Sequence, residues 1–486
     1  MKQLLAAKMS LLVVACSLFW SCSAPHKAVL AITHVTVIDA TGTTTQQEMT
    51  VLIMDEKIAA VGPSSSTAIP RGARVIDGTG KFLIPGLADM HIHLTGAGEP
   101  TGSRNFMLPL LVAHGITTVR DMGGTVDQLT ALRREIKSGA QIGPQIFFTG
   151  PFLDGEPPAF QPSIAIHNEE EGRVAVRNLQ AQGVDFIKTQ SRLSREAYFA
   201  IAVECRRRGI RFVGHVPDAV SALEASEAGQ SSIEHLTGIL LGYSTKEDEL
   251  RQEILTQVIA GQTAAQSRSN FEKWVRRLLN TRSLSRASTL NQEFVKNGTW
   301  QVPTFPVLVN LAFVTPKRDM ADDPRLKYIP RKLRSIWVQG REERLTGLTP
   351  ESAALREEVV KSSLEAAGRM NAAGVRFLAG TDSAAPNVFP GSSLHEDLAY
   401  LVAAGLTPMQ ALQAATRNPA EFLGKLQTQG TIEYGKFADL LLLDANPLVD
   451  IHNTQKIRAL VLRGKLLDRS ALDGLLASEE KFAAAN

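Results

Sequence analysis

The chain has 486 residues, of which 44% are hydrophobic and 21% are charged. This composition is typical of a globular protein and excludes an intrinsically disordered chain, and the length is sufficient for a large core with a smaller second domain. The formal net charge of only +3 leaves no overall field that would attract nucleic acid or an anionic membrane, so we expect no nucleic-acid partner.

The first 22 residues have the features of a signal peptide. Two lysines precede an apolar run over residues 11–20, which is too short for a membrane-spanning helix. Ser21 and Cys22 follow as in the lipobox of bacterial lipoproteins, although the two aromatic residues before them are larger than usual. We expect a lipoprotein of the cell envelope, on its periplasmic or surface side, attached to the membrane only through a lipid anchor at Cys22. Ordinary secretion and an uncleaved anchor are the alternatives.

Short β-branched runs separated by turn residues occur near both ends of the chain. They lie at residues 35–39, 49–53 and 57–62, and again at 435–444 and 457–464. Such runs predict strands joined by tight turns. We therefore expect the two terminal segments, residues 29–85 and 425–470, to form one small discontinuous β-sandwich domain.

Between these segments, short apolar strands alternate with helical stretches. One strand is expected to end at His93, and the others to cover residues 115–121, 145–150, 184–188, 211–215, 232–235, 300–304 and 375–382. About eight such β/α units predict an α/β fold, a (β/α)8 TIM barrel over residues 86–424. Two polar segments, at about residues 246–298 and 316–361, exceed a normal connection and are expected to be helical insertions beside the barrel mouth.

The residues most capable of chemistry occupy one topological position. His91 and His93 are one residue apart, which in a strand places both imidazoles on the same face, where they can chelate one ion. The C-terminal ends of other predicted parallel strands carry Lys188, His215, His235 and Asp382. These ends form the active site of a TIM barrel, so we expect one metal site. The alternative role for Asp382 is a helix N-cap.

The segments around these residues resemble the amidohydrolase superfamily, in particular Pro-Gly-Leu-Ala-Asp-Met-His91-Ile-His93, Asp-Phe-Ile-Lys188, Gly-His215-Val, Ile-Glu-His235 and Ala-Gly-Thr-Asp382. More narrowly, they are similar to its imidazolonepropionase-related and Xaa-Pro dipeptidase (prolidase-like) branch. The resemblance extends over nearly all of the chain after residue 22.

The resemblance implies a site with two divalent metal ions. In this family the lysine of the fourth strand reacts with carbon dioxide, and the resulting carbamate, here on Lys188, bridges the two ions. The more buried ion would be held by His91, His93 and Asp382, and the more exposed ion by His215 and His235. Imidazole nitrogens and carboxylate oxygens favour zinc, with cobalt or manganese as substitutes.

The resemblance further implies a metal-dependent hydrolase of C–N bonds, which uses a hydroxide bridging the two metals and Asp382 as the catalytic proton acceptor and donor. The expected small-molecule substrates are dipeptides, Xaa-Pro included, or N-acyl amino acids. Hydrolysis of a cyclic amide, an imidazolone or a lactone is the alternative, and so is a catalytically retired lipid-anchored binding protein. A homo-oligomer is compatible with each of these functions.

Several residues near the predicted strand ends are weaker candidates. His395, Tyr243 and Arg192 follow predicted ligands and could contact substrate. Arg120, at the end of the second strand, is expected to form an internal ion pair with Asp121 or another neighbour. Residues 149–158 replace a glycine- and histidine-rich loop found in many relatives, so substrate contacts in this loop are not carried over from them.

Overall fold

The computed structural model of the chain describes residues 29–42, 44–95, 105–259, 264–312 and 322–486. The expected signal peptide and the lipid anchor at Cys22 lie outside the described residues and stay predictions, as does the start of the second expected insertion. Within the described ranges, no helix combines the length and hydrophobicity that a membrane crossing requires.

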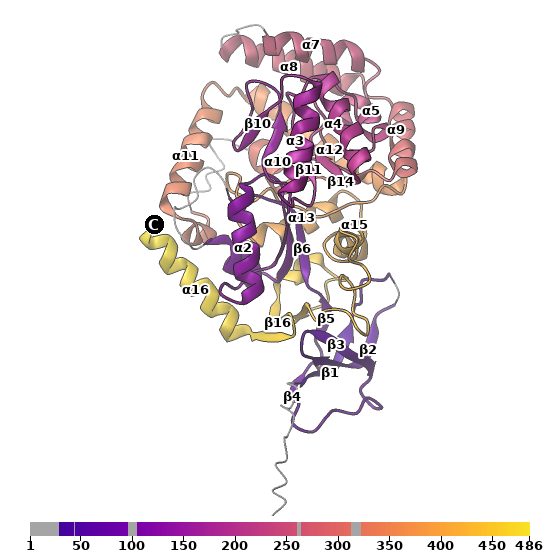
Figure 1. The fold of residues 1–486 in the computed structure, drawn as a ribbon, viewed down its shortest axis with the longest axis vertical. Helices are drawn as coiled ribbons and strands as arrows, with labels where there is room; N and C mark the ends of the chain where they lie inside the picture. The colour runs from indigo at the N-terminus through magenta and orange to yellow at the C-terminus, as the bar shows by residue number, and fades with distance from the viewer. Residues whose placement is uncertain (1–28, 43, 96–104, 260–263, 313–321) are drawn as a thin grey trace, which may run out of the picture.

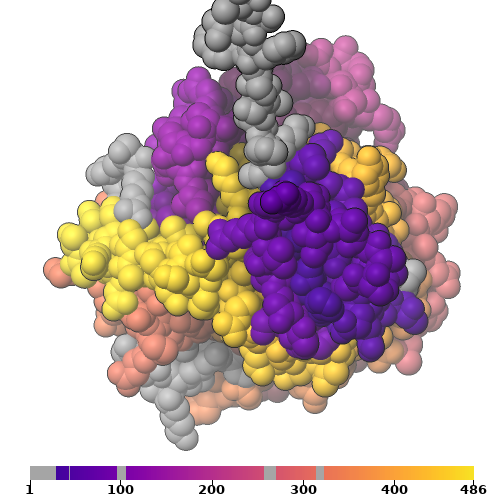
Figure 2. Space-filling model, turned by 90° about the horizontal axis from the view of Figure 1, so that it is seen from below, coloured from indigo at the N-terminus to yellow at the C-terminus, as the bar shows by residue number. Residues whose placement is uncertain are grey.

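Strands from both ends of the chain form one hydrogen-bonded sheet, which confirms the predicted β-rich domain (Figure 1). The strand order is β17-β16-β15-β5-β1-β2-β3, with β4 beside β1. Ile32, Val51 and Leu440 belong to its separate apolar core. Figure 2 shows the N-terminal and C-terminal segments adjoining on one face. The strands are β1 Val29–Val37, β2 Gln46–Met54, β3 Lys57–Pro63, β4 Arg74–Asp77, β5 Phe82–Pro85, β15 Leu440–Leu443, β16 Ile457–Leu462 and β17 Lys465–Asp468.

The sheet is continuous in sequence with the first barrel strand. β15 pairs antiparallel with β5, with Leu441 opposite Ile84. β5 leads through Gly86 directly into β6 (Leu87–Ile92), and a Cβ atom at Gly86 would lie 2.5 Å from the Thr117 side chain. Only glycine fits this close approach, so the sheet and the strand that carries His91 are joined by a tight, fixed connection.

The predicted (β/α)8 barrel is confirmed. Residues 375–383 act as the eighth strand, because Phe377 forms a parallel bridge to Gln301, and Ser383 forms one to Ile92. The parallel strands start near the sheet, so their C-terminal ends lie on the far side of the barrel from it (Figure 1). The strands after β6 are β7 Ile116–Asp121, β8 Gln145–Phe148, β11 Ile187–Thr189, β12 Phe212–Gly214, β13 Ser232–Glu234 and β14 Trp300–Val302, with β9 Phe152–Asp154 and β10 Ser163–Ala165 added after β8.

Helices connect the barrel strands and cover their C-terminal ends. Both segments expected to be insertions are helical where they are described, and α7 and α8 lie at the end of the molecule opposite the β-rich domain (Figure 1). The helices are α1 Met107–Ala113, α2 Val126–Ser138, α3 Glu169–Ala181, α4 Arg195–Arg208, α5 Ala222–Glu227, α6 Ile239–Gly242, α7 Glu247–Ile259, α8 Ala264–Asn280, α9 Leu284–Asn297, α10 Phe305–Ala312, α11 Arg331–Leu345, α12 Pro350–Ala372, α13 Ser392–Ala403, α14 Pro408–Ala414 and α15 Arg417–Phe422, with the 3-10 helices η1 Pro324–Tyr328 and η2 Ile451–Gln455.

A C-terminal helix, α16 (Arg469–Ala485), follows the last strand and was not expected from the sequence. The Asp468 side chain caps it by accepting a hydrogen bond from the Ala471 amide. α16 packs against α1 and η1, with Leu472 and Ala483 buried. The helix is rich in alanine, so its apolar face gives only a weak periodic signal in the sequence.

Candidate metal centre

The structure brings the six predicted ligands together at the C-terminal ends of the barrel strands. All six line one cavity of about 460 Å³, formed in part by His91, His93, Lys188, His215, His235 and Asp382. The imidazole rings form a continuous group, with centroids 5.5 Å apart for His91 and His93, 4.6 Å for His91 and His235, and 4.8 Å for His215 and His235.

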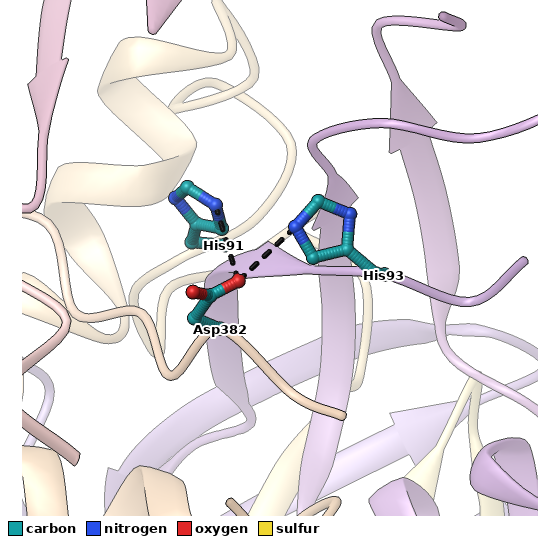
Figure 3. A group of neighbouring side chains, drawn as sticks. All are labelled: His91, His93 and Asp382. Atoms are coloured by element: carbon teal, nitrogen blue, oxygen red, sulfur yellow. Dashed lines mark ion pairs between the residues drawn. The ribbon is translucent and has the colours of Figure 1, made fainter. Parts of the chain in front are cut away.

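His91, His93 and Asp382 form the tightest group in this cavity (Figure 3). Asp382 Oδ1 lies 3.1 Å from His93 Nε2 and 3.6 Å from His91 Nε2. One ligand atom from each residue lies within 4.8 Å of the other two, a spacing that suits a single cation between them. These are the three residues predicted to hold the more buried ion.

The hydrogen bonds of His91 and His93 leave one nitrogen of each ring for a metal. His91 Nδ1 donates to Glu234 Oε2 over 2.8 Å, and His91 Nε2 is buried without a hydrogen-bond partner among the described residues. His93 Nδ1 lies 3.1 Å from the Gly123 carbonyl, which can only accept, so His93 Nε2 carries a lone pair in the neutral ring. These two lone pairs and the Asp382 carboxylate suit a bound cation, because a cation can lie between the three groups in place of a proton.

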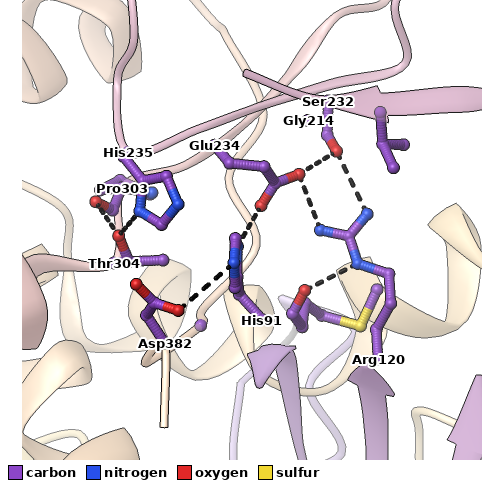
Figure 4. A network of polar contacts seen from close by, with 12 residues as sticks. His91, Arg120, Gly214, Ser232, Glu234, His235, Pro303, Thr304 and Asp382 are labelled. Atoms are coloured by element: carbon purple, nitrogen blue, oxygen red, sulfur yellow. Dashed lines mark hydrogen bonds and ion pairs between the residues drawn. The ribbon is translucent and has the colours of Figure 1, made fainter. Parts of the chain in front are cut away.

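The other two imidazoles are oriented by hydroxyl groups. The Thr304 hydroxyl donates to the Pro303 carbonyl and lies 2.6 Å from His235 Nδ1, so its oxygen accepts a hydrogen bond from Nδ1–H and leaves Nε2 unprotonated in the neutral ring (Figure 4). Ser191 Oγ lies 2.8 Å from His215 Nδ1. Such outer contacts fix ring orientation and tautomer in metal sites. His215 and His235 therefore fit the predicted second ion.

The electrostatics of the site favour neutral imidazoles. Burial lowers the pKa of His91 and His215 well below the ordinary value, and it lowers the pKa of His235 to about 4. Burial also acts to lower the pKa of His93, but the hydrogen bond and the charge of Asp382 outweigh it and raise the pKa. Neutral imidazole is the form that ligates metals, so three of the four rings are ready to bind without losing a proton.

Lys188 is buried within the same group of side chains, with 1% of its surface exposed. Within the described residues, no carboxylate lies within ion-pair distance of its ammonium group, and Nζ lies 5.9 Å from the centroid of the Phe152 ring. Burial lowers the pKa of Lys188 to about 8, although the charges of Glu234 and Asp382 act in the opposite direction. An unpaired buried lysine of low pKa is typical of a reactive amine.

Three site residues adopt left-handed backbone conformations that side chains disfavour. The φ angles are 57° at His235, 50° at Thr304 and 66° at Asp382. Each such residue costs about 1–3 kcal/mol of strain, and strain of this kind concentrates at functional sites. All three stand at or just after the C-terminal ends of barrel strands. His235 and Asp382 line the cavity, and Thr304 contacts the His235 ring.

A buried ion pair between Arg120 and Glu234 lies behind the predicted metal ligands (Figure 4), and Glu234 was not identified as the partner from the sequence. Glu234 Oε1 accepts hydrogen bonds from Arg120 Nη2 over 2.9 Å and from Ser232 Oγ over 2.5 Å, while its other oxygen holds His91. Arg120 Nε also donates to the Met90 carbonyl over 2.7 Å. The expected internal ion pair of Arg120 is therefore present, with Glu234 rather than Asp121 as its partner.

The three weaker candidates do not line the cavity. Tyr243 is buried and donates to Asn291 Oδ1 over 2.7 Å, and the exposed Arg192 donates to the Pro157 carbonyl over 2.6 Å. His395 is fully buried and bridges the His114 carbonyl and the Thr454 hydroxyl. Tyr243, Arg192 and His395 thus have structural contacts and are not among the described residues that line the cavity, because side-chain direction after a strand end cannot be read from spacing.

Replacing His395 by leucine is expected to destabilise the protein by about 2 kcal/mol, because the partly buried His114 carbonyl loses its donor. The value of kcat should stay within about twofold of wild type, since His395 lies outside the cavity. Urea unfolding and steady-state kinetics test both points, with the exposed His452→Leu as the matched control. A large loss of kcat in a fully folded His395→Leu enzyme would instead support the predicted contact between His395 and the substrate.

The sequence matches the amidohydrolase family over residues 82–244 and 312–467. The stretch between these two segments contains α7, α8 and α9. Among curated proteins, the L-hydantoinase of Paenarthrobacter aurescens is 29% identical over 139 residues, which are 28% of this chain and 30% of that protein. The chain thus matches only about a third or less of the length of the first curated relatives.

Solved structures match over nearly the full chain. A candidate prolidase from Bifidobacterium longum is 25% identical, with a TM-score of 0.66, and the match covers 93% of this chain and 99% of that one. A bottromycin amidohydrolase has a TM-score of 0.72 at 23% identity, with 94% and 90% coverage, and shows the shared fold. The matched segments include all six residues of the metal centre, and the chain therefore belongs to the amidohydrolase family.

Proposed function

We propose that the protein is a metal-dependent hydrolase of C–N bonds, acting on dipeptides, Xaa-Pro included, or on N-acyl amino acids. The observation that carries this proposal is the set of lone pairs at His91, His93 and Asp382, whose ligand atoms lie within 4.8 Å of one another. The similarity to a candidate prolidase supports the substrate class.

Two divalent ions, when bound, would activate a water molecule and polarise the scissile carbonyl. Asp382 is suited to accept the proton of that water. Burial alone would raise the pKa of Asp382, but in the metal-free site the hydrogen bond from protonated His93 and the neighbouring positive charges lower it overall, so the carboxylate is ionised at neutral pH. The same carboxyl group can then deliver the proton to the departing amine, which leaves Asp382 ionised for the next cycle.

Lys188 is suited to carry the carbamate that the family resemblance implies. Carbon dioxide reacts with a neutral amine, and the lowered pKa of Lys188, about 8, makes part of the amine neutral near physiological pH. A carbamate would supply the anionic oxygens that an ammonium group lacks. His215 and His235 line the same cavity and would supply ligands to the second ion.

The decisive test is an assay of the chain begun after Cys22, produced with zinc and bicarbonate, on a library of Xaa-Pro dipeptides, general dipeptides and N-acyl amino acids. We expect ninhydrin-detected release of amines by the wild type. Release should be lost after metal removal by a chelator, return with zinc, and be absent in Lys188→Ala and Asp382→Asn. Cleavage that survives chelation would overturn the proposal, and so would a folded protein that binds no metal.

A second candidate is hydrolysis of a cyclic amide, which the match to L-hydantoinase favours. The same metal centre can serve, because a ring amide presents the same carbonyl carbon and leaving nitrogen. Hydantoins and dihydropyrimidines added to the library distinguish the two functions. Ring opening without cleavage of linear amides would favour the second candidate.

A further inference from the structure

The cavity above the metal centre has apolar walls. They are built from segments that follow two different barrel strands. They include Phe152 and Phe160 after β8, and Val307, Leu308 and Leu311 on α10 and Leu333 on α11 after β14. Phe152, Val307 and Leu333 are buried beside the cavity, so these walls are packed against the protein and fixed in place. Among the described residues, the cavity therefore offers apolar surface that a bound molecule can cover.

The charges in the described lining are confined to the metal centre. Apart from the six predicted ligands, the polar side chains that line the cavity are neutral, as in Thr95, Gln161 and Gln190. An ionised group placed between the apolar walls would lose water without gaining a counter-charge from the described lining, which is strongly unfavourable. The walls therefore select against a charged substituent.

Phe160 indicates where an uncharged, apolar substituent would enter the cavity. Its ring is 59% exposed, although it lines the same cavity as the buried Phe152. Phe160 lies two residues beyond the segment 149–158, which replaces the glycine- and histidine-rich loop of many relatives. A large aromatic side chain exposed at the edge of a cavity is well placed to pack against an apolar ligand.

On the basis of the proposed hydrolase function, we infer that the substrate is an N-acyl amino acid with a large, uncharged, apolar acyl group, rather than a free dipeptide. Both halves of a free dipeptide carry a charge, an ammonium group on the acyl side and a carboxylate on the amine side. Either half would bring its charge between the apolar walls. An N-acyl amino acid places its neutral acyl group there and keeps its carboxylate outside.

The test compares N-acetyl-, N-butanoyl-, N-hexanoyl- and N-octanoyl-leucine with free Leu-Leu. Burial of each additional methylene should raise kcat/KM about fourfold until the cavity is filled. Leu-Leu should be cleaved more slowly than the butanoyl compound of lower mass. Phe160→Ala should lower kcat/KM for the octanoyl compound several times more than for the acetyl compound. Phe271→Ala, which removes an aromatic ring 46% exposed on α8, is the matched control.

Binding to the Asp382→Asn variant, measured by calorimetry with the same acyl series, separates this inference from the proposed function. Equal kcat/KM values across the series, with Leu-Leu cleaved as rapidly, would overturn the inference and leave the hydrolase function intact. Failure of the wild type to cleave any compound, with affinity that still rises along the series, would overturn the function and support the apolar site.

Discussion

Replacing Asp382 by asparagine is expected to lower kcat about a thousandfold, the usual contribution of a positioned proton acceptor and donor. The asparagine keeps a carbonyl oxygen near His93 but removes the negative charge that lies 3.1 Å from His93 Nε2. It can therefore neither take a proton from water nor return one to the leaving amine. The measurement is kcat on the best substrate of the library, together with the metal content of each chain by mass spectrometry.

Asp127→Asn is the control for Asp382→Asn, because Asp127 is exposed in the first turn of α2. It should keep the kcat and the metal content of the wild type. A residual kcat within tenfold of wild type in Asp382→Asn, at full metal content, would show that another group transfers the proton.

Replacing Glu234 by leucine is expected to destabilise the metal-free protein by about 3–5 kcal/mol, because Arg120 then remains buried with an uncompensated charge. Both side chains are fully buried, and the guanidinium lies against the rings of Phe186 and Phe422. His91 Nδ1 also loses its acceptor, so zinc affinity should fall about 10- to 100-fold. Urea unfolding of the metal-free protein and zinc competition with a chromophoric chelator measure the two effects separately.

The double variant Arg120→Leu/Glu234→Leu separates the effect of the unpaired Arg120 charge on stability from the effect of the lost His91 acceptor on zinc affinity. Removing both charges should restore most of the stability, since an apolar pair replaces the ion pair, while zinc affinity should stay low because His91 still lacks an acceptor. Glu421→Leu, which breaks the exposed pair with Arg376, should cost less than about 1 kcal/mol. Recovery of zinc affinity in the double variant would show that Glu234 does not act through His91.

The sequence was most informative where topology alone decides position. His91, Lys188, His215, His235 and Asp382 each lie at or just after the C-terminal end of a short apolar strand, and parallel strands in a barrel must end on one face. Strand alternation likewise placed His93 on the same side as His91. These are statements about backbone order, so they did not require knowledge of side-chain packing.

Side-chain direction and long-range pairing were harder to predict. Arg120 and Glu234 are charged residues of opposite sign in buried strands, which was a usable signal for an ion pair, but nothing in their spacing identified them as partners. His395 stands near Asp382 in sequence, yet its ring turns toward His114 and Thr454. Such contacts depend on how α13 rotates against its neighbours, which local patterns do not fix.

The junction between the β-rich sheet and the barrel also determines the order in which the molecule can assemble during synthesis. β5 and β6 emerge early, but β15, which pairs with β5, and residues 375–383, which pair with β6, emerge much later. The strand bearing His91 and His93 thus keeps an open edge on the ribosome until most of the chain has been made. Long-range pairing of this kind is slow, and open strand edges invite association between chains. Changes that weaken β15 should therefore reduce the yield of folded protein before they alter the metal centre of the molecules that do fold.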